Sequence, residues 1–207
     1  MLDLNKLREE QLKLSKKVII SDSFEKLELI GGVDFGYFNN EVVCSIAVCN
    51  KAMKQIEIKH SIKKSSLPYI VGFIAYRVGP PVSDAFSKLE NKPDLLIFSG
   101  NGILHPRRIG LASHMGIILD CPTIGIAKQL LTGEEKGDVI YVDKEARAEK
   151  IVTRAHAKPL FVSPGHKIGL KTSVELVKKY TLFPHKMPEP LHLAHKNVKE
   201  ILKKNQK

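Results

Sequence analysis

Long apolar runs are missing from this sequence. Its hydrophobic residues make up 43% of the 207 positions but occur in short, interrupted segments. No segment approaches the roughly 20 consecutive apolar residues that a membrane-spanning helix needs. The first charged residue of the chain is the acidic Asp3, and the basic segment that begins a secretory signal peptide is lacking. We therefore expect a globular, cytoplasmic protein with no membrane partner.

Cysteine is also scarce, and its three positions match no usual metal or redox pattern. Cys44 and Cys49 have four residues between them, a spacing that differs from zinc-binding motifs, and Cys121 stands far from both. In a strand, two residues an odd number of positions apart point to opposite faces. We interpret all three cysteines as small buried hydrophobic residues.

Acidic residues are outnumbered by basic ones. The chain has 33 Lys and Arg against 22 Asp and Glu, which gives a formal net charge of +11. This excess favours a polyanionic partner, above all DNA or RNA, and the alternative is a lysine-rich surface that only keeps the protein soluble. The length favours a single domain over residues 1–207.

Hydrophobic patterning predicts an antiparallel meander followed by alternating helices and strands. An amphipathic helix is expected over 4–18, capped by Asp3. The expected strands are 29–35, 41–48, 55–62, 94–99 and 122–127, with edge strands at 139–143 and 160–163. The later helices are expected at 70–77, 81–90, 110–119, 172–180 and 190–203. This order is typical of an α/β fold in which helices flank a mixed sheet.

Several ordered blocks of the sequence resemble the endonuclease V family. The match runs from residues 7–11 through 32–37 to 188–190, and its most specific blocks are 68–73, 100–108, 110–114 and 122–128. The resemblance implies a ribonuclease H-like fold and recognition of deaminated bases, above all inosine, in DNA or RNA. It also implies that the backbone is cut near the lesion with Mg2+ or Mn2+.

The metal-binding positions depart from the family pattern. Endonuclease V enzymes hold their ions with an Asp after the first strand, a Glu in a Phe-Arg-Glu-like motif, and an Asp opening an Asp-Gly-x-Gly motif. Asp34 matches the first position, but Val78 and Ser99 stand at the other two. Hard divalent ions prefer carboxylate oxygens, and one carboxylate with one hydroxyl compensates poorly for a lost water shell. We expect Asp34 to bind metal weakly or not at all.

Other positions of the family's active region persist. His105 matches a histidine near the scissile phosphate, Lys128 matches a lysine beside the metals, and His195 lies near a position that is His or Asp in the family. Arg107 and Arg108 follow in a glycine-rich loop that leads into a helix, an arrangement suited to a phosphate cradle. The plainer interpretations are a surface charge for Lys128 and a polar-face residue for His195.

The recognition positions are better retained than the cleavage positions. In the family, a Pro-Tyr-Ile-Pro wedge places its tyrosine in the space left by an extruded base. The corresponding segment here consists of Pro68, Tyr69, Ile70 and Val71. Tyr69 keeps the π face that stacking requires, whereas Val71 lacks the rigidity of the second proline. Gly100 and Gly102, on either side of Asn101, allow backbone to approach an extruded base closely.

Three functions remain open from the sequence. The first is a family member that binds nucleic acid at inosine-type bases but cleaves it weakly or not at all. The second is an active nuclease of DNA repair or RNA processing whose metal site is rebuilt from Asp34, His195 and the substrate phosphate. The third is a non-enzymatic interaction protein. The retained Tyr69, the glycine loop and the net charge of +11 favour the first.

Overall fold

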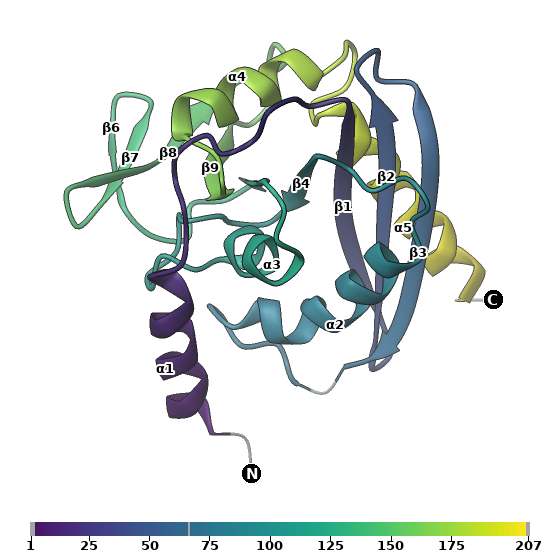
Figure 1. Cartoon of the computed structure of the whole chain (residues 1–207), viewed down its shortest axis with the longest axis horizontal. Helices are drawn as coiled ribbons and strands as arrows, with labels where there is room; N and C mark the ends of the chain where they lie inside the picture. The colour runs from purple at the N-terminus through teal and green to yellow at the C-terminus, as the bar shows by residue number, and fades with distance from the viewer. Residues whose placement is uncertain (1–2, 66, 206–207) are drawn as a thin grey trace.

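The computed structural model describes residues 3–65 and 67–205, which form one nine-stranded mixed sheet and five helices (Figure 1). The meander consists of β1 (Leu29–Phe38), β2 (Glu41–Asn50) and β3 (Gln55–Lys64). β4 (Leu95–Ser99) and β5 (Thr123–Ala127) are central and parallel to β1. The remaining strands are β6 (Glu134–Lys136), β7 (Val139–Val142), β8 (Glu145–Ile151) and β9 (Leu160–His166). The predicted α/β class, a mixed sheet flanked by helices, is confirmed.

The helices cover both faces of the sheet and bury two apolar layers. The helices are α1 (Leu4–Ser15), α2 (Ile74–Ser87), α3 (Leu111–Leu119), α4 (Leu170–Tyr180) and α5 (Glu189–Asn205). α2 and α3 pack over the layer that contains Cys44, whereas α4 and α5 pack over the layer that contains Cys49. The two cysteines therefore lie on opposite faces of β2, as predicted. All three cysteines are buried and free.

The N-terminal helix forms where the pattern predicts it but ends earlier. Asp3 caps it, since its Oδ1 accepts hydrogen bonds from the backbone N–H groups of Asn5 and Lys6. The helix stops at Ser15, three residues before the expected end at 18. Within the described ranges, no helix is long and apolar enough to cross a membrane.

The prediction of two helices over 70–77 and 81–90 is wrong. The structure has a single helix, α2, which begins at Ile74 and contains both Pro80 and Pro81. A proline inside a helix removes a backbone hydrogen bond at a cost of about 3 kcal/mol. The helix continues because Val78 and Val82 are 0% exposed, and packing of this buried stripe outweighs local propensity. Residues 67–73 are left as a loop.

The assignment of 139–143 and 160–163 as edge strands is also wrong. The strand order is β3-β2-β1-β4-β5-β9-β8-β7-β6, so β3 and β6 are the edges. Strand β8 was not predicted because most of its residues are charged, yet it pairs with both β7 and β9. Ion pairs of Arg147 with Glu145 and of Lys150 with Glu135 offset that polarity.

Candidate active site at the strand ends

The parallel strands bring polar residues to one edge of the sheet. Val33 on β1 and Phe98 on β4 are the last facing pair of that ladder, so Asp34 and Ser99 come next on adjacent strands. Lys128 follows the last residue of β5, the strand on the other side of β4. Ligand sites of open α/β sheets form where the carboxyl ends of parallel strands meet in this way.

Asp34 faces α5 because glycines flank it on the same face of β1. A Cβ atom on Gly32 would lie only 2.1 Å from the backbone of Pro190, so only glycine lets α5 approach this closely. The approach brings Nδ1 of His195 to 2.6 Å from Oδ2 of Asp34. Asp34 is 6% exposed, and its carboxylate is paired with the partly exposed imidazole of His195, which comes from a helix far along the chain.

A cavity of about 170 Å³ opens beside this pair, and we call it the Asp34 cavity. The structure brings together four residues singled out from the sequence, and these are Asp34, Ser99, Lys128 and His195. The remaining wall consists of Lys186, Met187, Leu191 and His192. Sequence reasoning missed Lys186 and His192. Both flank the block 188–190 that carries part of the family resemblance, and this was the signal that could have revealed them.

Positive charge gathers around the Asp34 cavity. Burial lowers the pKa of Lys186, and the neighbouring charges of Lys128, Arg154 and Lys158 lower it further. The pKa of His192 is lowered by burial, and its ring stacks on His185 with centroids 3.6 Å apart. The cavity therefore offers ammonium groups to an incoming anion.

The side chains present do not suit a divalent metal ion. Asp34 is the single carboxylate that lines the cavity, and its Oδ2 is already bonded to His195. Ser99 adds only a hydroxyl, whereas Mg2+ and Mn2+ prefer several charged oxygen ligands. In residues 3–65 and 67–205, no group of three or more His, Cys, Asp or Glu side chains could hold a metal.

Val78 lies on the other side of the sheet from this cavity. It is 0% exposed and belongs to the apolar layer beneath α2 and α3, together with Val33 and Phe98. Those two residues directly precede Asp34 and Ser99 in the chain. Val78 is therefore close to the site in the fold but does not line the cavity.

A second cavity, about 250 Å³ in volume, shares Ser99 with the first, and we call it the Tyr69 cavity. One wall is the loop before α2, where Tyr69 is 61% exposed. The facing wall is the β4–α3 loop, which contributes Gly100, Asn101 and His105. Oδ1 of Asn101 is buried and has no hydrogen-bond partner among the described residues. Asn101 therefore brings one unpaired acceptor to the wall of the cavity.

Three predicted recognition residues do not line the Tyr69 cavity. Pro68 and Ile70 belong to the same loop as Tyr69 but are not part of the wall. Gly102 is buried elsewhere, because a Cβ atom there would lie 2.0 Å from the backbone oxygen of Pro164 on β9. Its lack of a side chain serves packing of the loop against the sheet.

His105 connects the two walls of the Tyr69 cavity. Its Nε2 lies 3.1 Å from the backbone oxygen of Gly72, and its Nδ1 accepts the backbone N–H of Arg107 at 3.2 Å. These partners require a neutral ring with its proton on Nε2. Burial, followed by the charges of Arg107 and Arg147, lowers the pKa of His105 to about 4. In this arrangement His105 positions the loops.

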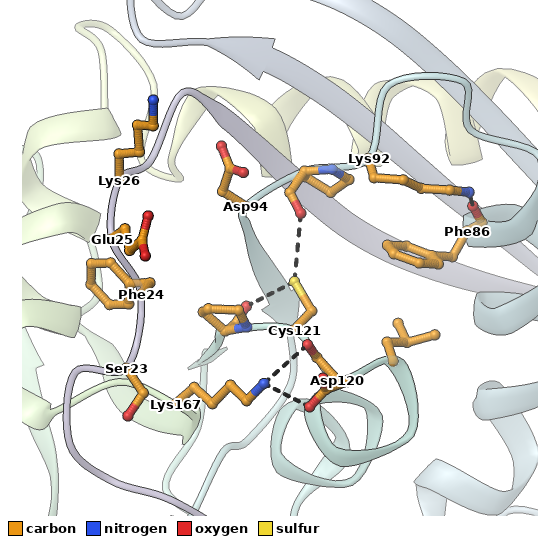
Figure 2. Close-up of a pocket in the computed structure, with 13 residues that line it drawn as sticks. Ser23, Phe24, Glu25, Lys26, Phe86, Lys92, Asp94, Asp120, Cys121 and Lys167 are labelled. Carbon is orange, nitrogen blue, oxygen red and sulfur yellow. Dashed lines mark hydrogen bonds and ion pairs between the residues drawn. The ribbon is translucent and has the colours of Figure 1, made fainter.

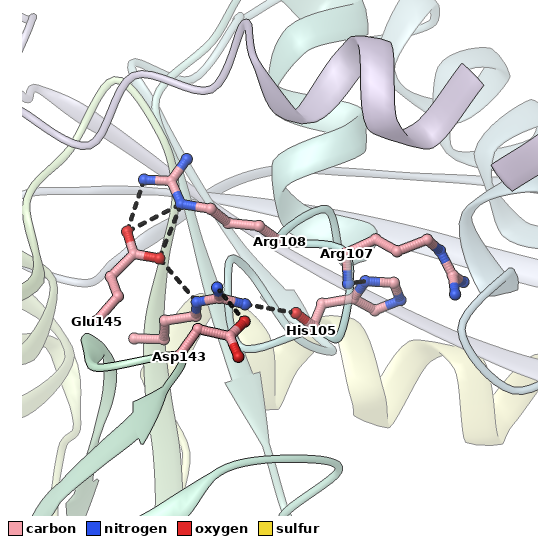
Figure 3. A network of polar contacts seen from close by, with 6 residues as sticks. His105, Arg107, Arg108, Asp143 and Glu145 are labelled. Atoms are coloured by element: carbon pink, nitrogen blue, oxygen red, sulfur yellow. Dashed lines mark hydrogen bonds and ion pairs between the residues drawn. The ribbon is translucent and has the colours of Figure 1, made fainter. Parts of the chain in front are cut away.

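The two arginines predicted to cradle a phosphate have intramolecular partners. Arg107 donates to Oε1 of Gln11 at 2.6 Å and to the backbone oxygen of Gly72 at 2.9 Å. Arg108 pairs with Glu145, and Arg147 links that carboxylate to the backbone oxygen of His105 (Figure 3). Their role as a cradle stays a prediction.

A larger cavity, about 500 Å³, lies at the opposite ends of the parallel strands. Several of its polar groups already have partners within the protein (Figure 2). Lys167 pairs with Asp120 at 2.6 Å, and the thiol of Cys121 points to the backbone oxygen of Pro93 at 3.6 Å. The unpaired polar groups and the strand-end geometry instead favour the two cavities that share Ser99.

The fold and the strand-end site together define a ribonuclease H-like α/β protein. The sequence profile of the endonuclease V family matches residues 12–196. The chain therefore belongs to the endonuclease V family. Endonuclease V of Dictyoglomus turgidum is 43% identical over 206 residues, which cover 95% of this chain and 89% of the relative. That of Thermosipho melanesiensis is 38% identical over 204 residues, with the same coverage of 95% and 89%.

Solved structures of the family share the fold. The crystal structure of endonuclease V from Bacillus subtilis has a TM-score of 0.91 at 30% identity and covers 100% of this chain and 94% of its own. Endonuclease V of Ciona intestinalis, in complex with a 24-mer DNA that contains an inosine followed by a ribo-adenosine, has a TM-score of 0.88 at 29% identity. That match covers 97% of this chain and 98% of the relative.

Proposed function

We propose that this protein binds nucleic acid at a deaminated, inosine-type base and cleaves the backbone weakly or not at all. The observation that carries the proposal is the contrast between two cavities that share Ser99. One presents an exposed tyrosine opposite a glycine-rich loop. The other retains a single carboxylate, Asp34, which is bonded to His195.

The Tyr69 cavity has the chemistry that an extruded base requires. The ring of Tyr69 can stack on the base or on its neighbour, an interaction that contributes about 1–3 kcal/mol per base. Hypoxanthine carries a proton on N1 where adenine has an acceptor, and the unpaired Oδ1 of Asn101 is an acceptor for such a donor. The inosine-containing DNA bound by the Ciona intestinalis relative supports the same class of ligand.

The Asp34 cavity supports binding of the backbone better than hydrolysis. Hydrolysis in the family pattern relies on a pair of divalent ions, and the carboxylates expected at positions 78 and 99 are replaced by Val78 and Ser99. Lys128 and Lys186 offer charge to a phosphate without an ion. An active nuclease that uses Mg2+ or Mn2+ through Asp34 and His195 is the alternative, and metal-dependent cutting would reveal it.

The test is a binding titration with a labelled single strand that contains either inosine or adenosine at one position, in buffer with a chelator. We expect tighter binding of the inosine strand. Tyr69→Ala should weaken binding of the inosine strand by roughly five- to hundred-fold, because it removes the stacking surface. Tyr141→Ala, on β7 away from both cavities, is the matched control. Equal affinity for the two strands would rule the proposal out.

A further inference from the structure

The loop between α4 and α5 carries an aromatic side chain outside both apolar layers. Phe183 is 92% exposed, the highest value among the large hydrophobic residues of the described chain. Nearby on the surface, Val152 is 64% and Leu182 41% exposed. Single exposed hydrophobic residues are common on protein surfaces. The surroundings of Phe183 therefore decide whether its ring has a ligand.

The loop that carries Phe183 leads directly into the Asp34 cavity. Lys186, three residues further on, lines that cavity. Two hydrogen bonds hold the loop against the segment after β8. Oγ1 of Thr153 donates to the backbone oxygen of Lys186 at 2.6 Å, and Nη1 of Arg154 donates to that of Pro184 at 3.4 Å. The ring is thus presented by an anchored loop beside the site.

Cations surround this loop. Lys128, Arg154 and Lys158 all lie near enough to Lys186 to act on its charge. In the part of the chain that the structure describes, none of these four side chains forms an ion pair with an acid, although other lysines and arginines do. Positive charge that tracks a backbone, together with an exposed aromatic ring, is the combination that binds single-stranded nucleic acid.

We propose that Phe183 is a second stacking platform, which holds a base of the same strand on the far side of the Asp34 cavity from Tyr69. The proposal rests on the proposed function. A strand whose base enters the Tyr69 cavity passes its backbone over Ser99, which both cavities share, and then meets Lys186. Phe183 stands three residues before Lys186 in the same loop, and Arg154 is bonded to the backbone oxygen of Pro184, the residue next to Phe183.

The first test uses the absence of tryptophan from the chain. Phe183→Trp creates a single fluorescent reporter on the platform, and a base that stacks on it should quench its emission. We expect saturable quenching by an inosine-containing single strand, with the same midpoint as a binding titration. Ile118→Trp, at a 54% exposed position of α3, is the matched control and should show no quenching. Unchanged emission of the Phe183→Trp protein at saturation would overturn the proposal.

The second test uses strand length. Phe183→Ala should weaken binding of a long single strand by roughly five- to hundred-fold, because stacking of one base is lost. Phe183→Tyr should keep the affinity, whereas Phe183→Leu, which is apolar but has no π face, should resemble the alanine variant. A trinucleotide centred on inosine lacks the further bases of the long strand, and we expect it to bind all variants equally.

The outcomes separate this proposal from the proposed function. If the unaltered protein prefers inosine but Phe183→Ala binds strands of every length as tightly, the platform is wrong and the lesion-binding function stands. If the preference for inosine is absent while the Phe183 variants still lose affinity for long strands, the lesion-binding function is wrong and the platform stands. If Phe183→Ala changes only self-association in sedimentation velocity, the ring is a protein contact and the platform is overturned.

Discussion

The side chains around the carboxylate of Asp34 are mainly positively charged, whereas those of a metal site are mainly negatively charged. One of its oxygens bonds to His195, and two ammonium groups, those of Lys128 and Lys186, line the same cavity. Three carboxylates at this place would attract cations, whereas the residues present attract a phosphate. The residues at positions 78 and 99 are therefore the basis of our proposal that the site binds the backbone with little or no cleavage.

Two buried histidines predict how stability depends on pH. Burial lowers the pKa of both His105 and His114 to about 4, while an unfolded histidine titrates near about 6.5. As the pH falls, the unfolded chain binds these protons first. The free energy of unfolding should therefore be undiminished above about pH 6.5 and fall between about pH 6.5 and 4, by up to about 1.4 kcal/mol per pH unit for each histidine.

Urea denaturation at a series of pH values checks this prediction. His114→Phe keeps an aromatic ring in contact with Tyr76 and removes one titrating group. The slope of unfolding free energy against pH should be smaller in this variant. An identical slope in the two proteins would show that His114 is not the source of the pH dependence.

Part of the site could be predicted from the residue types in the sequence, and part of it could not. Asp34 and Ser99 stand at or near the ends of the expected strands 29–35 and 94–99, so their convergence at one sheet edge could be expected. Lys186 enters the cavity only because α5 docks on β1, a contact that no local pattern specifies. The partners of Arg107 and Arg108 could not be foreseen either, since Gln11 and Glu145 are distant in sequence.

At the scale of elements, the docking of α5 on β1 determines the geometry of the site. Gly32→Ala should disrupt it, because the added Cβ would lie 2.1 Å from the carbonyl carbon of Pro190 and 2.2 Å from the nitrogen of Leu191. We expect a loss of about 1–3 kcal/mol or more in unfolding free energy, as for other overpacked sites. We also expect the contact between His195 and Asp34 to be lost.

Chemical denaturation measures the first effect, and the NMR signal of the His195 ring reports the second. Gly79→Ala in α2 is the matched control, since its nearest neighbour is the flexible side chain of Met115 at 3.3 Å. Alanine there also gains about 1 kcal/mol of helix propensity. Equal stabilities of the two variants would contradict the proposed packing of α5 on Gly32.

Helices and strands were predictable where the hydrophobic pattern of the sequence matched the burial of the residues in the fold. Strands β1, β2, β4 and β5 have nearly continuous apolar patterns, β3 alternates apolar with charged residues, and all five form. α2 was misjudged because its two prolines are strong local signals that tertiary packing overrides. Strand β8 was not predicted because its charged residues are typical of a loop. Its place in the sheet depends on the ion pair with β6 and on the pairing with β9, which no local pattern specifies.

At the scale of the whole molecule, the net charge of +11 predicts steep salt dependence of binding. Each phosphate neutralised on a single strand releases about 0.7 of a counterion. If Lys128, Arg154, Lys158 and Lys186 each meet a phosphate, the slope of log K against log salt should be about −3. Tyr69→Ala should lower affinity for the inosine strand and leave this slope unchanged, because stacking releases no ions.

Binding isotherms at several salt concentrations provide the measurement. The double variant with Lys128→Ala and Lys186→Ala should reduce the magnitude of the slope by about 1.4, since two phosphate contacts are lost. Affinity that does not vary with salt would show that the basic surface is not the nucleic-acid site. A non-enzymatic interaction protein would then be the better description of the chain.

Restoring both carboxylates should recover part of the cleavage activity. Ser99→Asp alone adds a ligand next to Asp34 and should raise metal binding with little turnover. Val78 itself does not line the Asp34 cavity, so the double variant, with Val78→Glu as well, tests whether the longer glutamate reaches the ion; if it does, the gain should be more than additive because ligands that hold one ion act as a unit. Val78 is 0% exposed, so a glutamate there without its metal should cost several kcal/mol, roughly 3 or more. Its folding is checked by circular dichroism before the assay.

The most direct measurement incubates an inosine-containing strand with Mg2+ or Mn2+ and follows binding and cutting together. The unaltered protein, purified free of contaminating nucleases, should bind the strand and leave it intact or cut it very slowly, while the double variant cuts it measurably. Robust metal-dependent cutting by the unaltered protein that disappears in Asp34→Ala would contradict the account and establish an active nuclease with a rebuilt site.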